Sequence, residues 1–113
     1  MKSRFVGKLA ELALSASGGW EPFREGIQIR RIWGDSRAGA SVALLRYEAG
    51  ARGPKHRHVG SEIIYVIAGS QSDERGTYAA GSLVVNPDGD EHSVWSDEGC
   101  VVLIVWERPI EFV

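Results

Sequence analysis

The chain has 113 residues, of which 43% are hydrophobic and 25% charged, and these values predict one globular domain spanning residues 1–113. Thirteen Lys and Arg against fifteen Asp and Glu give a formal net charge of −2, without the basic excess that is typical of nucleic-acid-binding proteins. A single cysteine, Cys100, excludes an internal disulfide, and no apolar run approaches the roughly 20 residues that cross a bilayer. We therefore expect a cytoplasmic protein with neither a nucleic-acid nor a membrane partner.

The N-terminal segment is predicted to form a short amphipathic helix over about residues 4–17. Its apolar residues recur at helical spacing and form one stripe: Phe5, Leu9, Leu12, Ala13 and Ala16. Ser17-Gly18-Gly19 follows as a helix stop. A basic transit peptide is the alternative, because Lys2 and Arg4 open the segment, but Glu11 argues against it.

From Trp20 onward the sequence predicts short strands. The segments rich in β-branched and aromatic residues are 27–32, 41–48, 63–68, 82–85, 92–95 and 101–106. Clusters of Gly, Pro, Asp and Ser separate them as turns at 34–36, 50–54, 72–76, 86–90 and 96–99. Regularly spaced short strands favour an antiparallel sandwich or barrel, and the connections are too short for the crossover helices of a parallel sheet.

Residues 100–106 are seven apolar residues in succession. A strand with one exposed face would alternate, so we expect this strand to be covered on both faces. Either the N-terminal helix or a second copy of the chain can supply the second cover, and a homodimer is predicted on this basis. Cys100, at the start of the run, is interpreted as a buried, inert thiol, since a redox sensor would need exposure and a lowered pKa.

The three histidines of the chain, together with one glutamate, are candidate metal ligands. His56 and His58 are two residues apart, so in a strand both side chains point to one face. Glu62 has the same parity, and His92 can join them from a neighbouring strand. Zinc, iron, manganese, nickel and copper accept imidazole nitrogen and carboxylate oxygen, and four such ligands leave positions open for water, dioxygen or a substrate. By itself a His-X-His in a polar loop is more often a solvated pair, so the surrounding residues decide.

Two glycine-framed segments around these residues resemble the two cupin motifs. The first spans residues 50–69 and has the two neighbouring histidines and Glu62 at the spacing of the motif. The second spans residues 81–96, contains His92 and ends in Ser96, where the motif usually has Asn. We interpret that departure as a change in a turn residue and not in a ligand. The glycines that open both motifs allow backbone angles closed to other residues.

The similarity extends over residues 40–106 and includes Ser72-Asp73-Glu74, Tyr78 and residues 95–100. In these features the chain resembles the cupin domain of ChrR-type anti-sigma factors and its single-domain relatives. The resemblance implies an all-β cupin barrel, an RmlC-like jelly roll or double-stranded β-helix, with a short N-terminal helix. It also implies one divalent metal ion per chain (zinc, iron, manganese or nickel), and the implied ligands are His56, His58, Glu62 and His92.

ChrR-type regulators also carry an N-terminal zinc-binding helical domain that binds the sigma factor, and this chain has no His/Cys cluster there. The resemblance therefore implies the fold and the metal site but not the anti-sigma activity. One implied function is a mononuclear metal-dependent dioxygenase or related enzyme on a small oxygenated substrate such as a diketone, hydroxyketone or phenol, with Glu62 as a catalytic base. The alternative is a ChrR-like metal-binding sensing module without catalysis, and a third is a cupin with a structural metal.

Several other side chains leave two interpretations open. Arg46 and Glu48 share the parity of apolar neighbours and either line a substrate cavity or occupy a strand edge. Tyr47 and Tyr65 could reach a pocket, although strand aromatics more often pack in the core. The tryptophans are expected to be core or interface anchors, namely Trp33, Trp95 and Trp106.

Overall fold

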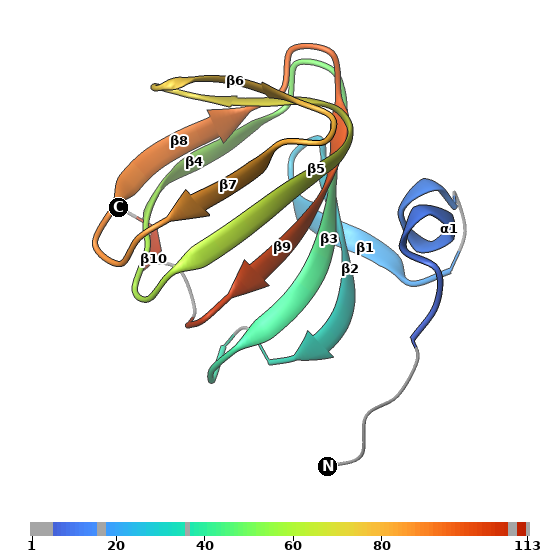
Figure 1. Ribbon diagram of the computed structural model, residues 1–113, viewed down its shortest axis with the longest axis horizontal. Coiled ribbons are helices and arrows are strands. Elements are labelled where there is room, and N and C mark those ends of the chain that lie inside the picture. Colours follow the sequence, from blue (N-terminus) through green and yellow to red (C-terminus); the bar gives the residue numbers. More distant parts are fainter. Residues whose placement is uncertain (1–5, 16–17, 36, 109–110, 113) are drawn as a thin grey trace.

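In the computed structural model of the chain, antiparallel strands curl into a barrel-like sheet with one short helix at its side (Figure 1). The structure describes residues 6–15, 18–35, 37–108 and 111–112. The elements are α1 (Leu9–Leu14), β1 (Trp20–Arg24), β2 (Ile27–Gly34), β3 (Ser41–Tyr47), β4 (Arg52–Arg57), β5 (Glu62–Asp73), β6 (Gly76–Ala79), β7 (Leu83–Asn86), β8 (Glu91–Trp95), β9 (Cys100–Trp106) and β10 (Glu111–Phe112). The predicted all-β architecture with a short N-terminal helix is confirmed.

Helix α1 is shorter than the sequence predicts. It begins at Leu9 and ends at Leu14, where the prediction was about residues 4–17, and Ser15 already has extended backbone angles. Phe5 and Ala16, two members of the predicted stripe, lie outside the described residues. A helix of this length is too short to be stable alone, so its packing on the sheet must hold it in place. Within the described residues, no helix is long and apolar enough to cross a membrane.

All six predicted strands are present, but β1, β4, β6 and β10 were not predicted. Strand β1 contains Pro22, and β4 contains Gly53-Pro54, which the sequence analysis assigned to a turn. Both strands carry an irregularity in their pairing, between Pro22 and Arg24 and between Gly53 and His56. Proline is tolerated at such irregular or edge positions. Strands β1 and β4 can therefore contain residues that are typical of loops.

Strand β5 connects the two halves of the barrel. Its first part, from Glu62, pairs with β7 and β9, whereas its last part, up to Asp73, pairs with β6 and β8. The change occurs at an irregularity between Val66 and Ala68, next to Gly69, which has φ +72°. Residues 72–76 are predicted to be a turn, but Ser72 and Asp73 belong to this strand. Because β5 bends at this corner, its first part belongs to one half of the sheet and its last part belongs to the other half.

The main core fills the interior of the barrel. Ile29, Val66 and Val102 are fully buried there, and Cys100 is 5% exposed, which confirms the buried thiol. A smaller apolar cluster lies between α1 and the outer face of the sheet, where Ala13 packs with Leu44 and Val101 and with partly buried neighbours.

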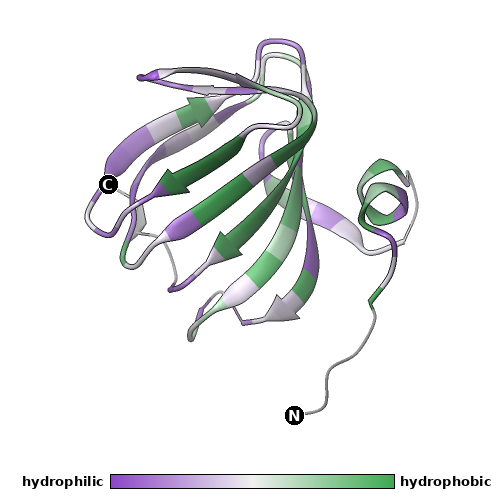
Figure 2. Cartoon of the chain, in the orientation of Figure 1, coloured by the Kyte–Doolittle hydropathy of each residue, from purple (hydrophilic) through white to green (hydrophobic). Residues whose placement is uncertain are grey.

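The helix therefore covers one end of the apolar strand β9. This is one of the two predicted alternatives, the other being a second copy of the chain. Strands β5, β7 and β9 consist largely of hydrophobic residues (Figure 2). Four large apolar side chains are exposed on two of these strands: Ile63, Tyr65, Leu83 and Val85.

Candidate metal centre

The four predicted ligand residues come from three strands at one end of the barrel. His56 lies in β4 and His58 directly after it, Glu62 is the first residue of β5, and His92 lies in β8. His56 and His92 are direct Cα partners in the β4–β8 pair. Arg57 is exposed between two buried histidines, so the chain alternates at this point as predicted.

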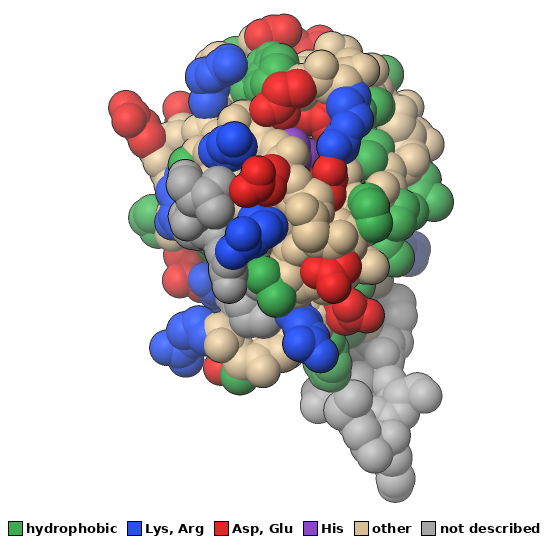
Figure 3. All heavy atoms as spheres, turned by 90° about the vertical axis from the view of Figure 1, so that its left-hand side faces the viewer, with side chains coloured by type: hydrophobic (Ala, Val, Ile, Leu, Met, Phe, Trp, Pro, Cys, Tyr) green, Lys and Arg blue, Asp and Glu red, His purple; other side chains and the backbone are tan. Residues whose placement is uncertain are grey.

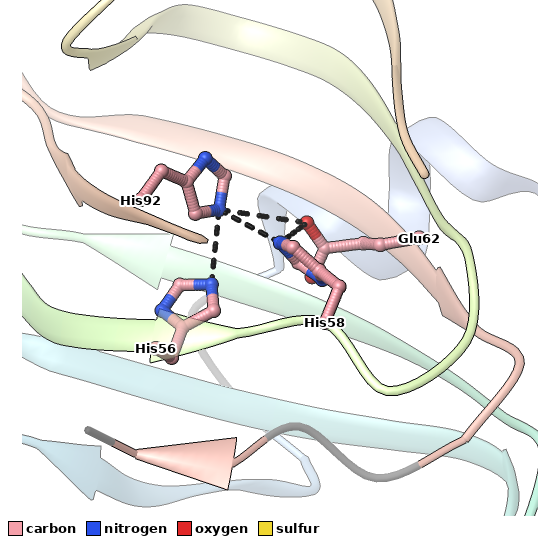
Figure 4. Close-up of side chains that lie close together, drawn as sticks. All are labelled: His56, His58, Glu62 and His92. Atoms are coloured by element: carbon pink, nitrogen blue, oxygen red, sulfur yellow. Dashed lines mark hydrogen bonds and ion pairs between the residues drawn. The ribbon is translucent and has the colours of Figure 1, made fainter. Parts of the chain in front are cut away.

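All four side chains are buried, with exposed fractions between 1% and 6%, and they converge on one point (Figure 4). Nε2 of His92 lies 2.9 Å from Nε2 of His56 and 3.0 Å from Nε2 of His58. Oε1 of Glu62 lies 3.5 Å from Nε2 of His58 and 4.0 Å from Nε2 of His92. The four ligand atoms are all within 4.8 Å of one another.

The four separations between 2.9 and 4.0 Å fit a single shared ion, and the upper limit of 4.8 Å requires a small inward movement of the ligand atoms. Ligand atoms about 2.1 Å from one metal centre are roughly 3 Å apart at right angles and roughly 4.2 Å apart when opposite. Three imidazole nitrogens and a carboxylate oxygen also form a donor set that several first-row divalent metals accept. The four residues could therefore hold a metal ion.

Burial favours the uncharged forms of His56 and His58. The pKa of His58 is lowered to about 4, first by burial and then by the neighbouring His56 and His92. Burial also lowers the pKa of His56, against a hydrogen bond to the backbone of Pro54 that raises it. Neutral imidazoles at neutral pH have the lone pairs that metal binding requires.

Glu62 is held from both sides by the strands that flank it. It is the direct Cα partner of Asn86 on β7 and of Trp106 on β9. Nδ2 of Asn86 donates to Oε1 over 3.0 Å, and the indole N–H of Trp106 donates to Oε2 over 2.5 Å. Burial raises the pKa of Glu62 to about 7, although both hydrogen bonds act in the opposite direction. From the sequence, Trp106 is predicted to be a core or interface residue and Asn86 a turn residue, and neither is predicted to contact the site.

Two of the imidazoles have partners on the side away from the cluster. Nδ1 of His56 lies 3.1 Å from the carbonyl oxygen of Pro54, and Nδ1 of His92 lies 3.3 Å from Oδ2 of Asp73. Asp73 is 5% exposed and was predicted to be a turn residue. In the sequence, only the resemblance of residues 72–74 to the ChrR-type domain marked this position.

An apolar cavity of about 30 Å³ adjoins the cluster. His56 and Glu62 line it, and Tyr47 and Gln71 contribute a hydroxyl and an amide 3.4 Å apart. Tyr47 therefore reaches the pocket, whereas Tyr65 lies exposed on the outer face. A ligand that entered this cavity would contact two of the candidate metal ligands directly.

Neither Arg46 nor Glu48 lines the cavity beside the candidate ligands, and Glu48 lines a separate surface pocket. Arg46 points outward, where its guanidinium lies over the ring of Trp20 at 4.2 Å and donates to Oε1 of Gln28. Glu48 is exposed. The inward-facing residue between them, Tyr47, lines the cavity instead.

Ser96, where the motif usually has Asn, is not a turn residue on the surface. It is fully buried, and its hydroxyl donates to the carbonyl oxygen of Ser70 over 2.6 Å. Its backbone groups pair with Gly50 and Ala51. The serine therefore connects three segments of the barrel and is not one of the candidate metal ligands.

Charged side chains surround the small area where a histidine reaches the molecular surface (Figure 3). Near His58, Arg75 from the β5–β6 turn forms an ion pair with Asp90 from the loop before β8, whose backbone carbonyl oxygen accepts the N–H of His58. The Arg75 guanidinium lowers the pKa of Asp90 by hydrogen bonding and by charge.

Comparison with known proteins is consistent with this geometry. The family described as the ChrR cupin-like domain matches residues 11–111. A search of curated proteins gives no match. Similar solved structures include an acetylacetone dioxygenase from Acinetobacter johnsonii, with a TM-score of 0.78, 19% identity, and coverage of 100% of this chain and 85% of the other.

A second similar structure is that of Rhodobacter sphaeroides SigE in complex with the anti-sigma ChrR, with a TM-score of 0.70 and 23% identity over 80% of this chain. A third is a protein with a cupin-like fold from Ralstonia eutropha, with a TM-score of 0.67 and 21% identity over 73% of this chain. The chain spans about half of these two, 49% and 55% of their lengths. At these identities the likeness shows the fold.

Proposed function

The chain belongs to the ChrR cupin-like domain family, and from this premise we propose that it is a metal-dependent enzyme, a dioxygenase or a relative of one. The proposed substrate is a small oxygenated organic molecule such as a diketone, hydroxyketone or phenol. The observation that carries the proposal is the convergence of three imidazoles and one carboxylate beside an apolar cavity that reaches His56 and Glu62.

In this proposal the histidines hold the ion through Nε2 and Glu62 holds it through Oε1. When bound, a divalent ion of this kind supplies Lewis-acid chemistry, and a redox-active one also supplies chemistry with dioxygen. Zinc, iron, manganese and nickel are all compatible with the donor set. The metal that is available in the cell therefore decides which ion binds.

A cavity of about 30 Å³ has room for roughly one water molecule, so in this proposal the substrate enters it only by displacing the side chains of its walls. The remaining residues of the cavity would then orient the substrate. Apolar side chains exclude water from the space beside Glu62, and the Tyr47 hydroxyl and Gln71 amide offer hydrogen bonds to an oxygen of the substrate. Glu62 is the proposed base, because it is the only carboxylate among the described residues that line the cavity. Its Oε2 accepts the indole N–H of Trp106, and its Oε1 is the oxygen that faces the histidines.

A ChrR-like sensing module without catalysis is the second candidate function. The family match and the similarity to the SigE–ChrR complex favour it. In that case the four side chains would hold a metal that stabilises the barrel or responds to oxidants. A separate partner would bind the chain differently according to the state of this metal.

Metal analysis followed by oxygen consumption separates the two functions. The purified chain is analysed for bound metals, reloaded with Fe²⁺, Mn²⁺, Ni²⁺ or Zn²⁺, and supplied with small diketones and phenols in an oxygen electrode. We expect oxygen consumption that requires both metal and substrate and that is lost in Glu62→Gln. A chain that binds metal but consumes no oxygen with any of these metals and substrates would contradict the enzyme and favour the sensing module.

We also propose that the chain forms a homodimer through the outer apolar face formed by Ile63, Tyr65, Leu83 and Val85. These four side chains lie on adjacent strands, and β5 and β7 pair them directly, Ile63 with Val85 and Tyr65 with Leu83. A two-fold interface brings the same patch of both copies together, and an uncharged apolar face is complementary to itself. A cytoplasmic location remains a prediction from the single cysteine.

A further inference from the structure

The β5–β6 hairpin contacts the chain on both sides of His92, at Asp90 just before β8 and at Ser93 within it. On one side the guanidinium of Arg75 pairs with the carboxylate of Asp90. On the other side the carboxylate of Glu74 accepts the backbone N–H of Ser93 at 2.9 and 3.0 Å. The hairpin therefore has a fixed position relative to the segment that carries this candidate ligand.

Between these two contacts, Asp73 connects the hairpin to the imidazole itself. Oδ2 lies 3.3 Å from Nδ1 of His92. Oδ1 accepts two hydrogen bonds, one of 2.9 Å from the hydroxyl of Tyr78 and one of 2.8 Å from the backbone N–H of Arg75. The carboxylate is buried, and these donors leave Oδ2 directed at the ring.

The opposite edge of the same ring faces the cluster. Nε2 of His92 lies 2.9 Å from Nε2 of His56 and 3.0 Å from Nε2 of His58. A neutral imidazole carries one N–H, and a carboxylate can only accept a hydrogen bond from it. The contact with Asp73 therefore places the proton of His92 on Nδ1 and leaves the lone pair on Nε2, toward the other ligands.

We infer that Asp73, fixed by Tyr78 and the hairpin turn, is the positioning residue for His92: it selects the tautomer and the ring orientation in which Nε2 can bind a metal. This inference rests on the proposed metal site. It also gives a function to the Ser72-Asp73-Glu74 segment, which was predicted to be a turn and which resembles the ChrR-type domain.

The test uses zinc affinity, measured by competition with a chromophoric chelator, for the wild type and three variants. Asp73→Ala removes the acceptor, and Asp73→Asn keeps the shape and an acceptor oxygen but removes the charge. Glu74→Gln is the matched control, because it removes the charge of a neighbouring carboxylate but keeps a side-chain oxygen that can accept the backbone N–H of Ser93. Thermal unfolding without metal shows whether each variant folds. If Asp73→Ala does not fold, the zinc affinity of Asp73→Asn tests the inference.

Loss of a carboxylate partner behind a ligating histidine typically weakens metal binding by about 10–100-fold, and we expect this for Asp73→Ala. Asp73→Asn should give a smaller loss, and Glu74→Gln should bind within about twofold of the wild type. As a spectroscopic readout, zinc-loaded wild type and Glu74→Gln should show a slowly exchanging His92 Nδ1–H resonance by NMR, and Asp73→Ala should not.

Two results would overturn the inference and leave the metal site intact: zinc affinities of both Asp73 variants within twofold of a zinc-binding wild type, or a His92 Nδ1–H that exchanges equally fast in wild type and Asp73→Ala. A wild type that binds no zinc or other divalent metal would overturn the metal site and this inference together.

Discussion

The indole N–H of Trp106 and the carboxylate of Glu62 are hydrogen-bonded across the β5–β9 pair, in which the two residues are direct Cα partners. The opposite neighbour in the same row, Asn86, donates to the other carboxylate oxygen. One row of the sheet thus fixes both oxygens of a buried glutamate. This arrangement aims Oε1 at the imidazoles before any metal arrives.

Trp106→Phe should weaken zinc binding about tenfold, because it frees one oxygen of Glu62 while a ring stays in the core. An unpaired buried oxygen should also lower the free energy of unfolding by about 1–3 kcal/mol. Chelator competition and urea denaturation measure the two effects. Trp95→Phe is the control, since that indole lies against Arg52 and outside the site. Equal zinc affinity in both variants would show that the indole does not position Glu62.

The two motif glycines Gly69 and Gly81 should tolerate substitution very differently. Both have positive φ, but a Cβ on Gly69 would lie 2.0 Å from the carbonyl oxygen of Gly99, whereas a Cβ on Gly81 would meet open space. We expect Gly81→Ala to lower the free energy of unfolding by about 1 kcal/mol, from backbone strain alone. Gly69→Ala should cost about 3 kcal/mol or more, because the strand pair must separate. Similar urea midpoints for the two variants would contradict the tight corner in β5.

Cys100 should react slowly with thiol reagents in the folded chain. Burial raises the pKa of its thiol to about 11, so the reactive thiolate is scarce at neutral pH. Relative to the urea-unfolded chain, the rate at pH 8 should be about a hundredfold lower, and it should rise about tenfold per pH unit up to the pKa. Equal rates in the folded and unfolded chain would mean that the thiol is accessible, and would favour the redox-sensing interpretation.

Leu83→Asp should convert the proposed dimer to a monomer, because it places a charge in the centre of the outer apolar face. Leu83 is 66% exposed in the single chain. Leu14→Asp is the matched control, since Leu14 is 63% exposed but lies on α1. Light scattering after size-exclusion chromatography gives the mass of each variant. A wild type that is monomeric at all concentrations, or a Leu83→Asp variant that stays dimeric, would contradict the proposed interface.

Strands with a clear apolar or alternating pattern could be predicted from the sequence. β3 and β9, for example, carry runs of Val, Leu and Ile and were found close to their predicted limits. β4 could not be predicted, because Gly53-Pro54 gives it the composition of a turn and its pairing with β8 is a long-range interaction. The extension of β5 to Asp73 likewise depends on β6 and β8, which lie later in the chain.

The candidate ligands could be predicted because their spacing is local. His56 and His58 alternate along one short segment, and the motif frames place Glu62 and His92 relative to them. The residues that hold these side chains are distant in sequence: Asn86 is 24 and Trp106 is 44 residues from Glu62. Their contacts follow from strand register, which a single sequence does not specify.

Titration of the metal-free chain with Zn²⁺ in a calorimeter tests most directly whether the four side chains hold one ion. The wild type should bind one ion per chain, and His92→Ala should bind about a hundredfold more weakly, as expected when one of four ligands is removed from a site of roughly 10–16 kcal/mol. No binding to the wild type, or unchanged affinity in His92→Ala, would contradict the metal centre.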